Sequence, residues 1–185
     1  MFYGDFFPDF LAGLAFLHAW PFLPDVARIE IARTYAFHAE DRLPFDASDL
    51  DAQQIDRLLS QHFEPHPAAW VLQSSYPAAT IWASSDDADA LTRIQWQAET
   101  IAVTRGVDAV HVSLVPLGVG PCLTAIRTGA TLAAALAIAG EMTPLCDPPA
   151  VLAALLRCDL LSAPTKDHDH EIVQHDDAQE CGINS

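Results

Sequence analysis

The sequence predicts an α+β fold, in which an N-terminal helical part is followed by a small unit of strands and helices. Three observations lead to this prediction. Apolar residues in the first 83 positions recur mainly at helical spacing. From residue 94 the pattern changes to a period of two over two short stretches, which is typical of paired strands. Two helical patterns then close the chain, so strands and helices are segregated along it.

The segment 21–40, PFLPDVARIEIARTYAFHAE, predicts one helix around which the N-terminal part is organised. Apolar residues recur along it at intervals of three and four, so we expect it to be covered on two sides. Pro24 and Asp25 suit its first turn, because proline has no N–H to lose there and a carboxylate meets the positive end of the helix dipole.

Two shorter helices are expected on either side of this central helix. An aromatic-rich helix is predicted over residues 8–17, and the stretch DAQQIDRLLS predicts another after an acidic turn at 41–51. Pro65 and Pro67 then interrupt any regular element. The N-terminal part is therefore predicted to be mainly helical up to these prolines.

Extended segments are expected in four places. Residues 68–75, AAWVLQSS, have the composition of a strand, and 76–85 are compatible with either a strand or a helical turn. Residues 94–103 and 110–114 alternate apolar and polar side chains and predict two strands joined by a turn at Gly106. A further extended piece is predicted over residues 122–126.

Two helices, at 128–140 and 148–161, are expected to close the fold. Neither has a polar side broad enough for a free-standing helix, so both should pack on the strands. The glycines at 118–120 lack the order and the Lys-Ser/Thr ending of phosphate-binding loops, so no nucleotide site is predicted.

We expect four regions along the chain. They are a helical partner-binding part (1–83), an acidic linker (84–93), a small α+β unit resembling peptide-recognition domains (94–163) and a disordered acidic tail (164–185). The linker follows from the run SSDDADA, and the tail has too little apolar surface to offset its ordering entropy.

Composition narrows the function classes. The chain has 185 residues, 51% of them hydrophobic, and a net charge of −16 from 25 acidic and 9 basic residues. Nucleic-acid binding gains most of its affinity from cations placed against phosphates, so this balance argues against a nucleic-acid partner. No apolar run approaches the ~18 residues that span a bilayer. The first residues lack the basic region of a signal peptide, so we expect a cytoplasmic protein without a membrane partner.

Candidate metal ligands and nucleophiles do not form a recognisable site. The cysteines are widely spaced without a CxxC pair, so we expect free thiols. His62 and His66 flank Glu64, but Pro65 opposes the helix that would bring the two rings together. Ordering the tail costs about 1 kcal/mol or more per residue, which favours adventitious metal binding there. The side chains concerned in the tail are His168, Asp169, His170, His175 and Cys181. We therefore predict no metal site and no cofactor in this chain.

A family resemblance rests on motifs spread over residues 2–162. The run FLPDVARIE with Tyr35 and His38-Ala39 resembles the central helix of the HvfC/BufC family, whose members carry a DNA-binding label. Further segments are similar in the same order: His66-Pro67-Ala68, Ser75-Tyr76-Pro77, Ile81-Trp82 and Gly129 to Leu132. In that family the segment similar to residues 2–20 follows a further helical domain, so we expect a shortened member or a fragment.

The resemblance implies an accessory subunit in the modification of a ribosomally made peptide. Its expected partners are a precursor peptide and a multinuclear non-haem iron oxygenase that modifies cysteines of that peptide, with the iron ligands in the oxygenase. The residues expected to bind this partner are Phe10, Arg28, Glu30, Arg33, Tyr35 and His38. No serine nucleophile elbow, HExxH pair or recognisable carboxylate pair is present, so we assign no catalytic residue.

Residues 94–161 resemble the PqqD-like peptide-recognition fold, a winged-helix relative that binds leader peptides along a strand edge beside a helix. The mechanism would be β-augmentation, in which the strand edge supplies N–H and C=O groups and the helix an apolar groove. The residues expected to bind the peptide are Arg105, Val110, Val112, Leu152, Leu155, Leu156 and Arg157. Two alternatives remain open: a DNA-binding transcriptional regulator, and a stand-alone metal-binding or stress protein that uses the histidine-bearing tail.

Overall fold

The computed structural model describes residues 4–47, 52–106 and 108–162, and the predicted tail lies outside these ranges. The helices are α1 (Phe7–Ala12), the 3₁₀ turn η1 (Ala15–Leu17), α2 (Leu23–Phe37), α3 (Ala52–Leu59), α4 (Ala78–Ala83), α5 (Ala88–Leu91), α6 (Val119–Arg127), α7 (Leu132–Met142) and α8 (Pro148–Arg157). The strands are β1 (Glu64–Pro65), β2 (Trp70–Ser74), β3 (Glu99–Arg105), β4 (Val110–Leu114) and β5 (Leu161–Ser162). The α+β class and the helical N-terminal part are confirmed.

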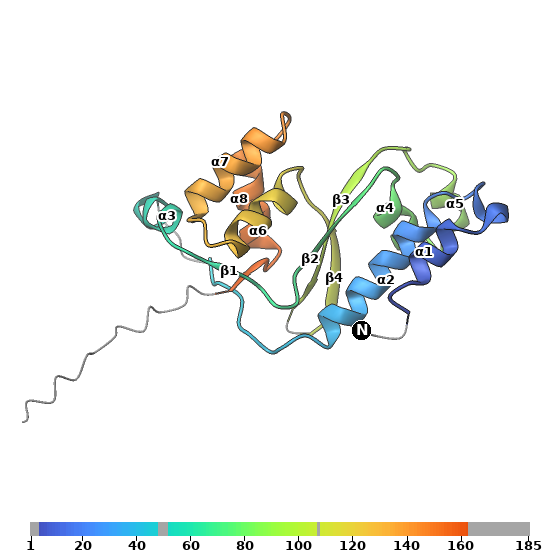
Figure 1. Ribbon diagram of the computed structural model, residues 1–185, viewed down its shortest axis with the longest axis horizontal. Coiled ribbons are helices and arrows are strands. Elements are labelled where there is room, and N and C mark those ends of the chain that lie inside the picture. The colour runs from blue at the N-terminus through green and yellow to red at the C-terminus, as the bar shows by residue number, and fades with distance from the viewer. Residues whose placement is uncertain (1–3, 48–51, 107, 163–185) are drawn as a thin grey trace, which may run out of the picture.

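A three-stranded antiparallel sheet lies at the centre of the molecule, in the order β2-β3-β4 (Figure 1). Val71 of β2 lies opposite Ala102 of β3, and Val103 of β3 lies opposite Val112 of β4. The predicted turn between the last two strands is present, because the Gly106 N–H donates to the Ala109 carbonyl over 2.9 Å. A separate two-stranded ribbon joins β1 to β5.

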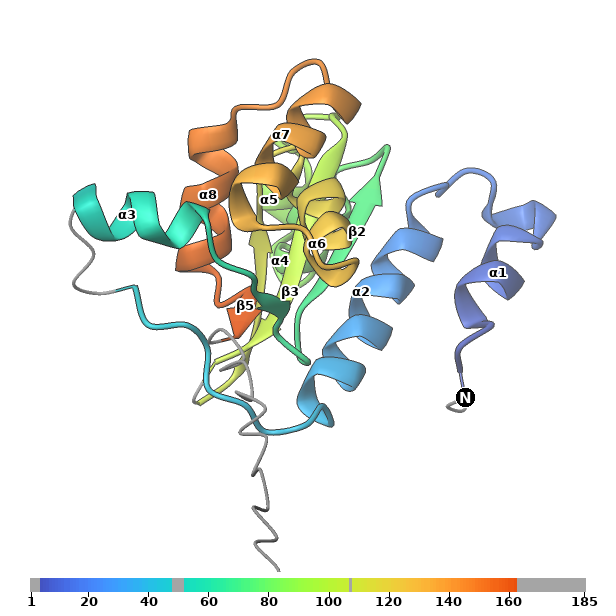
Figure 2. The same ribbon diagram turned by 60° about the vertical axis from the view of Figure 1, so that its left-hand side comes forward.

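Helices cover both faces of this sheet (Figure 2). On one face α2 and α4 pack against Ile101 and Val103 of β3, with Ile29 of α2 fully buried. On the other face α6, α7 and α8 pack around Ala102 and Val71. Because β3 is covered on both sides, its residues 99–104 are all buried, including two threonines and a glutamate.

The central helix is confirmed as α2, with Pro24 and Asp25 in its first turn. Its buried positions, Ile29, Ala32 and Ala36, follow the predicted helical spacing. The helix is contacted by the sheet and by α1, as expected for a helix covered on two sides. Small alanines at two of the three buried positions let the helix axis lie close to the sheet.

The expected boundary at 84–93 does not separate two packing units. Strand β2 belongs to the first 83 residues but pairs along its whole length with β3, and α2 packs on the same sheet. Part of the predicted linker forms the helix α5, in which the Asp87 side chain accepts from the Asp89 and Ala90 N–H groups. The acidic run marks only a polar surface. The pairing of β2 with β3, which lie on either side of this run in the sequence, places both parts of the chain in one sheet.

Several local predictions were wrong at the level of single elements. Residues 122–126 are helical and belong to α6, because Gly118 adopts a φ of +99° and turns the chain into a helix there. The first helix ends at Ala12 instead of continuing to 17, and β3 begins at Glu99 instead of 94. The segment 76–85, compatible with either a strand or a helical turn, takes the helical alternative as α4. A short apolar run fits a strand or a buried helix equally well, which explains these errors.

Three helices follow β4 in the structure, and the winged-helix and PqqD-like arrangement stays a prediction. Within the described ranges, no helix combines the length and the apolar composition needed to cross a membrane.

Candidate functional site

The charged residues expected to bind a partner through α2 are engaged within the chain. Arg28 pairs with Asp25 at 2.5 Å and with Asp9 of α1 at 3.3 Å. Glu30 pairs with Arg33 at 2.8 Å, and Trp82 of α4 contacts both side chains. The Arg28–Asp9 contact joins α1 to α2, and all these pairs together leave less charge for an outside partner than the sequence predicts.

The helix α4 presents Trp82 to the Glu30-Arg33 pair. The indole N–H donates to Glu30 over 2.5 Å, and the Arg33 guanidinium lies 4.9 Å from the centre of the Trp82 ring. The arrangement is a cation–π contact closed by a hydrogen bond. It explains why a tryptophan in the motif Ile81-Trp82 lies on a partly exposed surface.

Of the other predicted partner residues, Tyr35 is engaged and two are exposed. The Tyr35 hydroxyl donates to Asp5 over 2.6 Å, and its ring stacks on Trp70 with centroids 5.0 Å apart. His38 caps the C-terminal end of α2 at the surface, and Phe10 is 60% exposed. Phe10 and His38 are therefore exposed, as are Arg28 and Glu30, although these last two are engaged in ion pairs.

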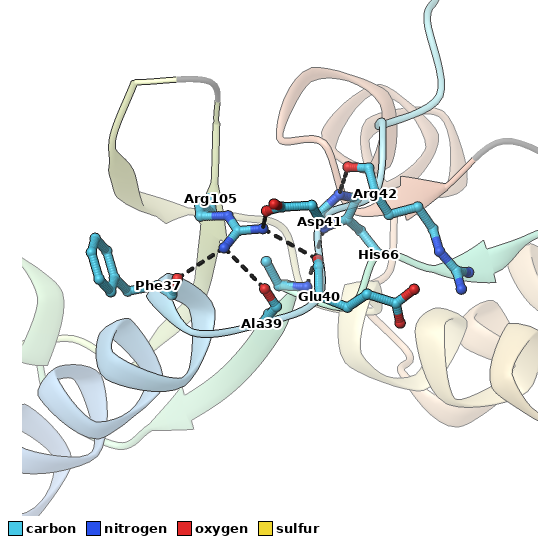
Figure 3. A network of polar contacts seen from close by, with 8 residues as sticks. Phe37, Ala39, Glu40, Asp41, Arg42, His66 and Arg105 are labelled. Carbon is cyan, nitrogen blue, oxygen red and sulfur yellow. Dashed lines mark hydrogen bonds and ion pairs between the residues drawn. The ribbon is translucent and has the colours of Figure 1, made fainter.

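Arg105, a predicted peptide-binding residue, reaches back to the end of α2 (Figure 3). One guanidinium nitrogen donates to the carbonyls of Phe37 and Ala39 over 2.8 and 3.0 Å. The other donates to the Glu40 carbonyl over 3.2 Å and to the Asp41 carboxylate over 2.7 Å. A cation here satisfies carbonyls that the helix leaves unpaired and complements the negative end of its dipole. Arg105 is thus occupied in holding α2 to the sheet.

His66 is buried, and both of its ring nitrogens have partners. Its Nδ1 accepts from the Ala68 N–H over 3.1 Å, so the proton lies on Nε2, which donates to the Arg42 carbonyl over 2.8 Å (Figure 3). His62 lies at the surface next to α7, in a bridge with Thr131. In the ranges 4–47, 52–106 and 108–162, no group of three or more His, Cys, Asp or Glu side chains is placed to hold a metal ion.

The apolar residues predicted to form one peptide groove lie on opposite faces of the sheet. Val110 and Val112 of β4 pack toward α2, whereas Leu155 of α8 is buried in the core on the other face. Leu152 and Leu156 pack at the border of that second core. Alternate residues of a strand point to opposite faces, so the register of β4 decides this separation. The expected groove between β4 and α8 is therefore not formed.

Arg105 and Val110 instead border a hollow of about 600 Å³ between the end of α2 and the β3-β4 turn. It is lined by Phe37, Asp41, Arg42, Leu43, Pro44, His66, Arg105, Gly106, Asp108, Ala109, Val110 and Asp159. Because Arg105 is committed to the α2 carbonyls and to Asp41, it offers little free charge to a ligand in this hollow. Arg157 lies exposed in the last turn of α8 and does not line it.

An edge strand with outward-facing backbone groups is found at β2. The carbonyl of Thr100 in β3 accepts from the Val115 N–H over 2.9 Å, so Thr100 directs its backbone groups toward β4. Its opposite residue, Gln73, therefore directs its own N–H and C=O away from β3, and Val71 two positions earlier does the same. Among the residues that the structure describes, β2 pairs with β3 alone, so these four groups form an open edge.

A groove runs beside this edge. A hollow of about 780 Å³ is lined by Ala69, Trp70, Val71, Gln73, Gly120, Pro121, Leu123, Thr124, Ala125, Arg127, Thr128, Ile138 and Met142. These residues come from β2 and from the helices α6 and α7. Trp70, Ile138 and Met142 are 37%, 37% and 68% exposed, so the walls carry accessible apolar surface. Gly120 of α6 lies beside the strand, since a β-carbon built there would be in ordinary van der Waals contact with Val71 at 3.6 Å.

A smaller hollow of about 420 Å³ adjoins it along the preceding residues of the chain. It is lined by Glu64, Pro65, His66, Pro67, Ala69, Trp70, Ile126 and Arg127, so the two hollows share Ala69, Trp70 and Arg127. Together they form one groove along residues 64–73, which we call the β2 groove. Sequence analysis recognised the strand at 68–75 but assigned the peptide edge to β4.

None of the three cysteines in the described ranges lines the hollows at β2 or at the end of α2. Cys122, Cys146 and Cys158 are free thiols, as predicted for the cysteines in the described ranges. Burial, with a smaller effect of Cys146, raises the pKa of Cys122 to about 12. Burial also raises the pKa of Cys158. Thiols held in the protonated form are poor nucleophiles and poor metal ligands.

Comparison with known proteins does not identify the site. No protein-family model matches the sequence, and no match to it was found among curated proteins. The geometry of the β2 groove and the resemblance in the motifs are the two observations that bear on function.

Proposed function

We propose that the protein is a non-catalytic accessory subunit that binds a precursor peptide and presents it to a multinuclear non-haem iron oxygenase for modification of cysteine residues. The observation that carries the proposal is the open edge of β2 beside the apolar walls of the β2 groove. The motif resemblance supports the choice of partner. The iron ligands would belong to the oxygenase.

The β2 groove has the two components that β-augmentation requires. The N–H and C=O groups of Val71 and Gln73 offer a ladder to an added strand, and main-chain pairing supplies affinity with little dependence on sequence. Side chains at alternate positions of that strand would enter the hollow and pack against Ile138 and Met142 of α7. A peptide of about five residues would match the length of β2.

Exposed aromatic residues of the N-terminal helical part support a protein partner on another surface. Large apolar side chains that are at least half exposed gather in the segments around α1, η1 and the approach to β3: Phe6, Phe7, Phe10, Phe16, Trp20 and Trp96. Exposed aromatic side chains in such number are typical of protein interfaces, which are enriched in aromatic residues. With a net charge of −16 on the chain, a basic rim on the partner would speed the encounter.

A pair of substitutions at Gln73 tests the peptide site. Gln73→Pro deletes an N–H that points away from β3 and adds a ring at the open edge, whereas Gln73→Ala keeps the backbone donor. We expect Gln73→Pro to weaken binding of a precursor-type peptide by about tenfold or more, from a lost hydrogen bond and a steric block. Gln73→Ala should bind nearly as the parent chain does.

The measurement is fluorescence anisotropy with labelled peptides, combined with thermal unfolding of each variant. Equal binding by Gln73→Pro and the parent chain would contradict the use of this edge. For the protein partner, size-exclusion chromatography of the chain co-expressed with the oxygenase should show one complex that carries iron. A chain that elutes as a monomer in the presence of the oxygenase would contradict the accessory role.

A further inference from the structure

Arg127 is a cation placed at the junction of the two hollows of the β2 groove. It lies in the last turn of α6, is exposed, and lines both the 420 Å³ and the 780 Å³ hollow. Four other arginines, Arg28, Arg33, Arg42 and Arg105, have carboxylate partners. Among the residues described by the structure, no carboxylate pairs with Arg127.

The groove is locally positive on a strongly acidic protein. Its other charged lining residue is Glu64, whose carboxylate is neutralised by an ion pair with Arg42. The remaining lining side chains are apolar or neutral polar groups. The uncompensated charge at Arg127 therefore contrasts with the net charge of −16 of the whole chain. A guanidinium that no carboxylate in the described residues engages can donate two parallel hydrogen bonds to the carboxylate of a ligand.

We propose that the β2 groove selects extended peptides with an aspartate or glutamate whose carboxylate pairs with Arg127, followed or preceded by apolar side chains that pack on α7. This inference rests on the proposed function and names the class of peptide. Ile138 and Met142 line the larger hollow alone, so the acidic and the apolar recognition points lie at different places along the strand. A second copy of the chain is a poorer occupant, because two bodies with a net charge of −16 repel each other.

A charge reversal with a matched control tests the inference. Arg127→Glu reverses the cation in the groove, and Arg157→Glu makes the same change in the last turn of α8, outside both hollows. A display library of random short peptides is selected separately on the parent chain and on each variant. We expect the parent chain and Arg157→Glu to enrich an acidic residue at a fixed distance from apolar positions, and Arg127→Glu to enrich a basic one there.

Binding constants of the selected peptides then give the magnitude. Replacing the acidic residue of a selected peptide by its amide should weaken binding to the parent chain about fivefold, the effect of one exposed ion pair, and should leave binding to Arg127→Gln unchanged. Thermal unfolding of every variant checks that the fold is retained.

Two outcomes separate the two levels of the proposal. If peptide binding is sensitive to Gln73→Pro but the acidic preference is absent, or persists unchanged in Arg127→Glu, the role of Arg127 is overturned and the peptide site stands. If no selected peptide is sensitive to Gln73→Pro, the site itself is overturned. Concentration-dependent dimers of the parent chain that Gln73→Pro abolishes would assign the edge to a second copy.

Discussion

Replacing Arg105 by Gln tests whether this residue holds α2 to the sheet or recognises a ligand. The side chain is 19% exposed and donates four hydrogen bonds, two of them to carbonyls at the end of α2 at 2.8 and 3.0 Å. The bond to Asp41 contributes little, because that carboxylate is 99% exposed. Hydrogen bonds from a charged donor are worth about 1.5–3 kcal/mol each, but water can reach these carbonyls once the guanidinium is gone.

We therefore expect Arg105→Gln to lower the free energy of unfolding by about 2–3 kcal/mol. At 2–4 °C per kcal/mol for a chain of this size, the melting temperature should fall by about 5–10 °C. Arg105→Lys keeps a charge at the negative end of the helix dipole with fewer donors, so its loss should be about half as large. Arg157→Gln, an exposed arginine at the end of α8, is the control and should change stability by no more than about 0.5 kcal/mol.

Urea denaturation followed by circular dichroism measures these changes, and anisotropy with a groove-binding peptide measures function in parallel. The folded Arg105→Gln chain should bind the peptide as the parent chain does, since Arg105 does not line the β2 groove. A stability within about 0.5 kcal/mol of the parent chain, accompanied by loss of peptide binding, would refute the reasoning and restore the role predicted from the sequence.

Three further predictions follow from buried contacts. Gly118→Ala should destabilise the fold by about 2–4 kcal/mol in urea denaturation, because φ is +99° and the new β-carbon would lie 2.5 Å from the Cys146 sulfur; an unchanged midpoint would contradict this. Glu99→Gln should cost about 1–2 kcal/mol by the same assay, since its carboxylate accepts from the Ala79 and Thr80 N–H groups at the start of α4, and Glu99→Asp, which keeps the charge on a shorter stem, is its comparison. Because the pKa of the Cys122 thiol is raised in the folded state, ionisation of this thiol favours the unfolded chain. Its contribution to the free energy of unfolding is therefore complete below about pH 9 and is lost as the pH rises toward 12. The slope of unfolding free energy with pH in that range should therefore be smaller in Cys122→Ala, and equal slopes would show that this thiol is not its source.

Sequence patterns alone located the central helix, the three strands of the sheet and the closing helices. The spacing of Ile29, Ala32 and Ala36 marks one face of a helix, and alternation marks the strand pair around Gly106. These signals are local, because a helix face and a strand face each repeat within a few residues. The same local character explains the errors, since an apolar run such as 122–126 does not distinguish a strand from a buried helix.

The candidate site depended on contacts that no local pattern contains. The open edge of β2 follows from the order β2-β3-β4, in which β2 and β4 lie at the two margins of the sheet and β3 lies in the middle. The register of β4 placed Val110 and Val112 opposite the core that holds Leu155, so the predicted groove could not form.

Composition determined that the protein is strongly acidic, but the tertiary structure decided where positive charge remains available. Arg105 and Arg127 look alike in the sequence, as single cations near apolar segments. Packing brought the end of α2 to Arg105, where four acceptors occupy its guanidinium. Arg127 was left at the junction of two hollows beside an open strand edge. The physical reason for the difference is that the fold brought hydrogen-bond acceptors from a distant part of the chain to Arg105 but brought no carboxylate from the described residues to Arg127.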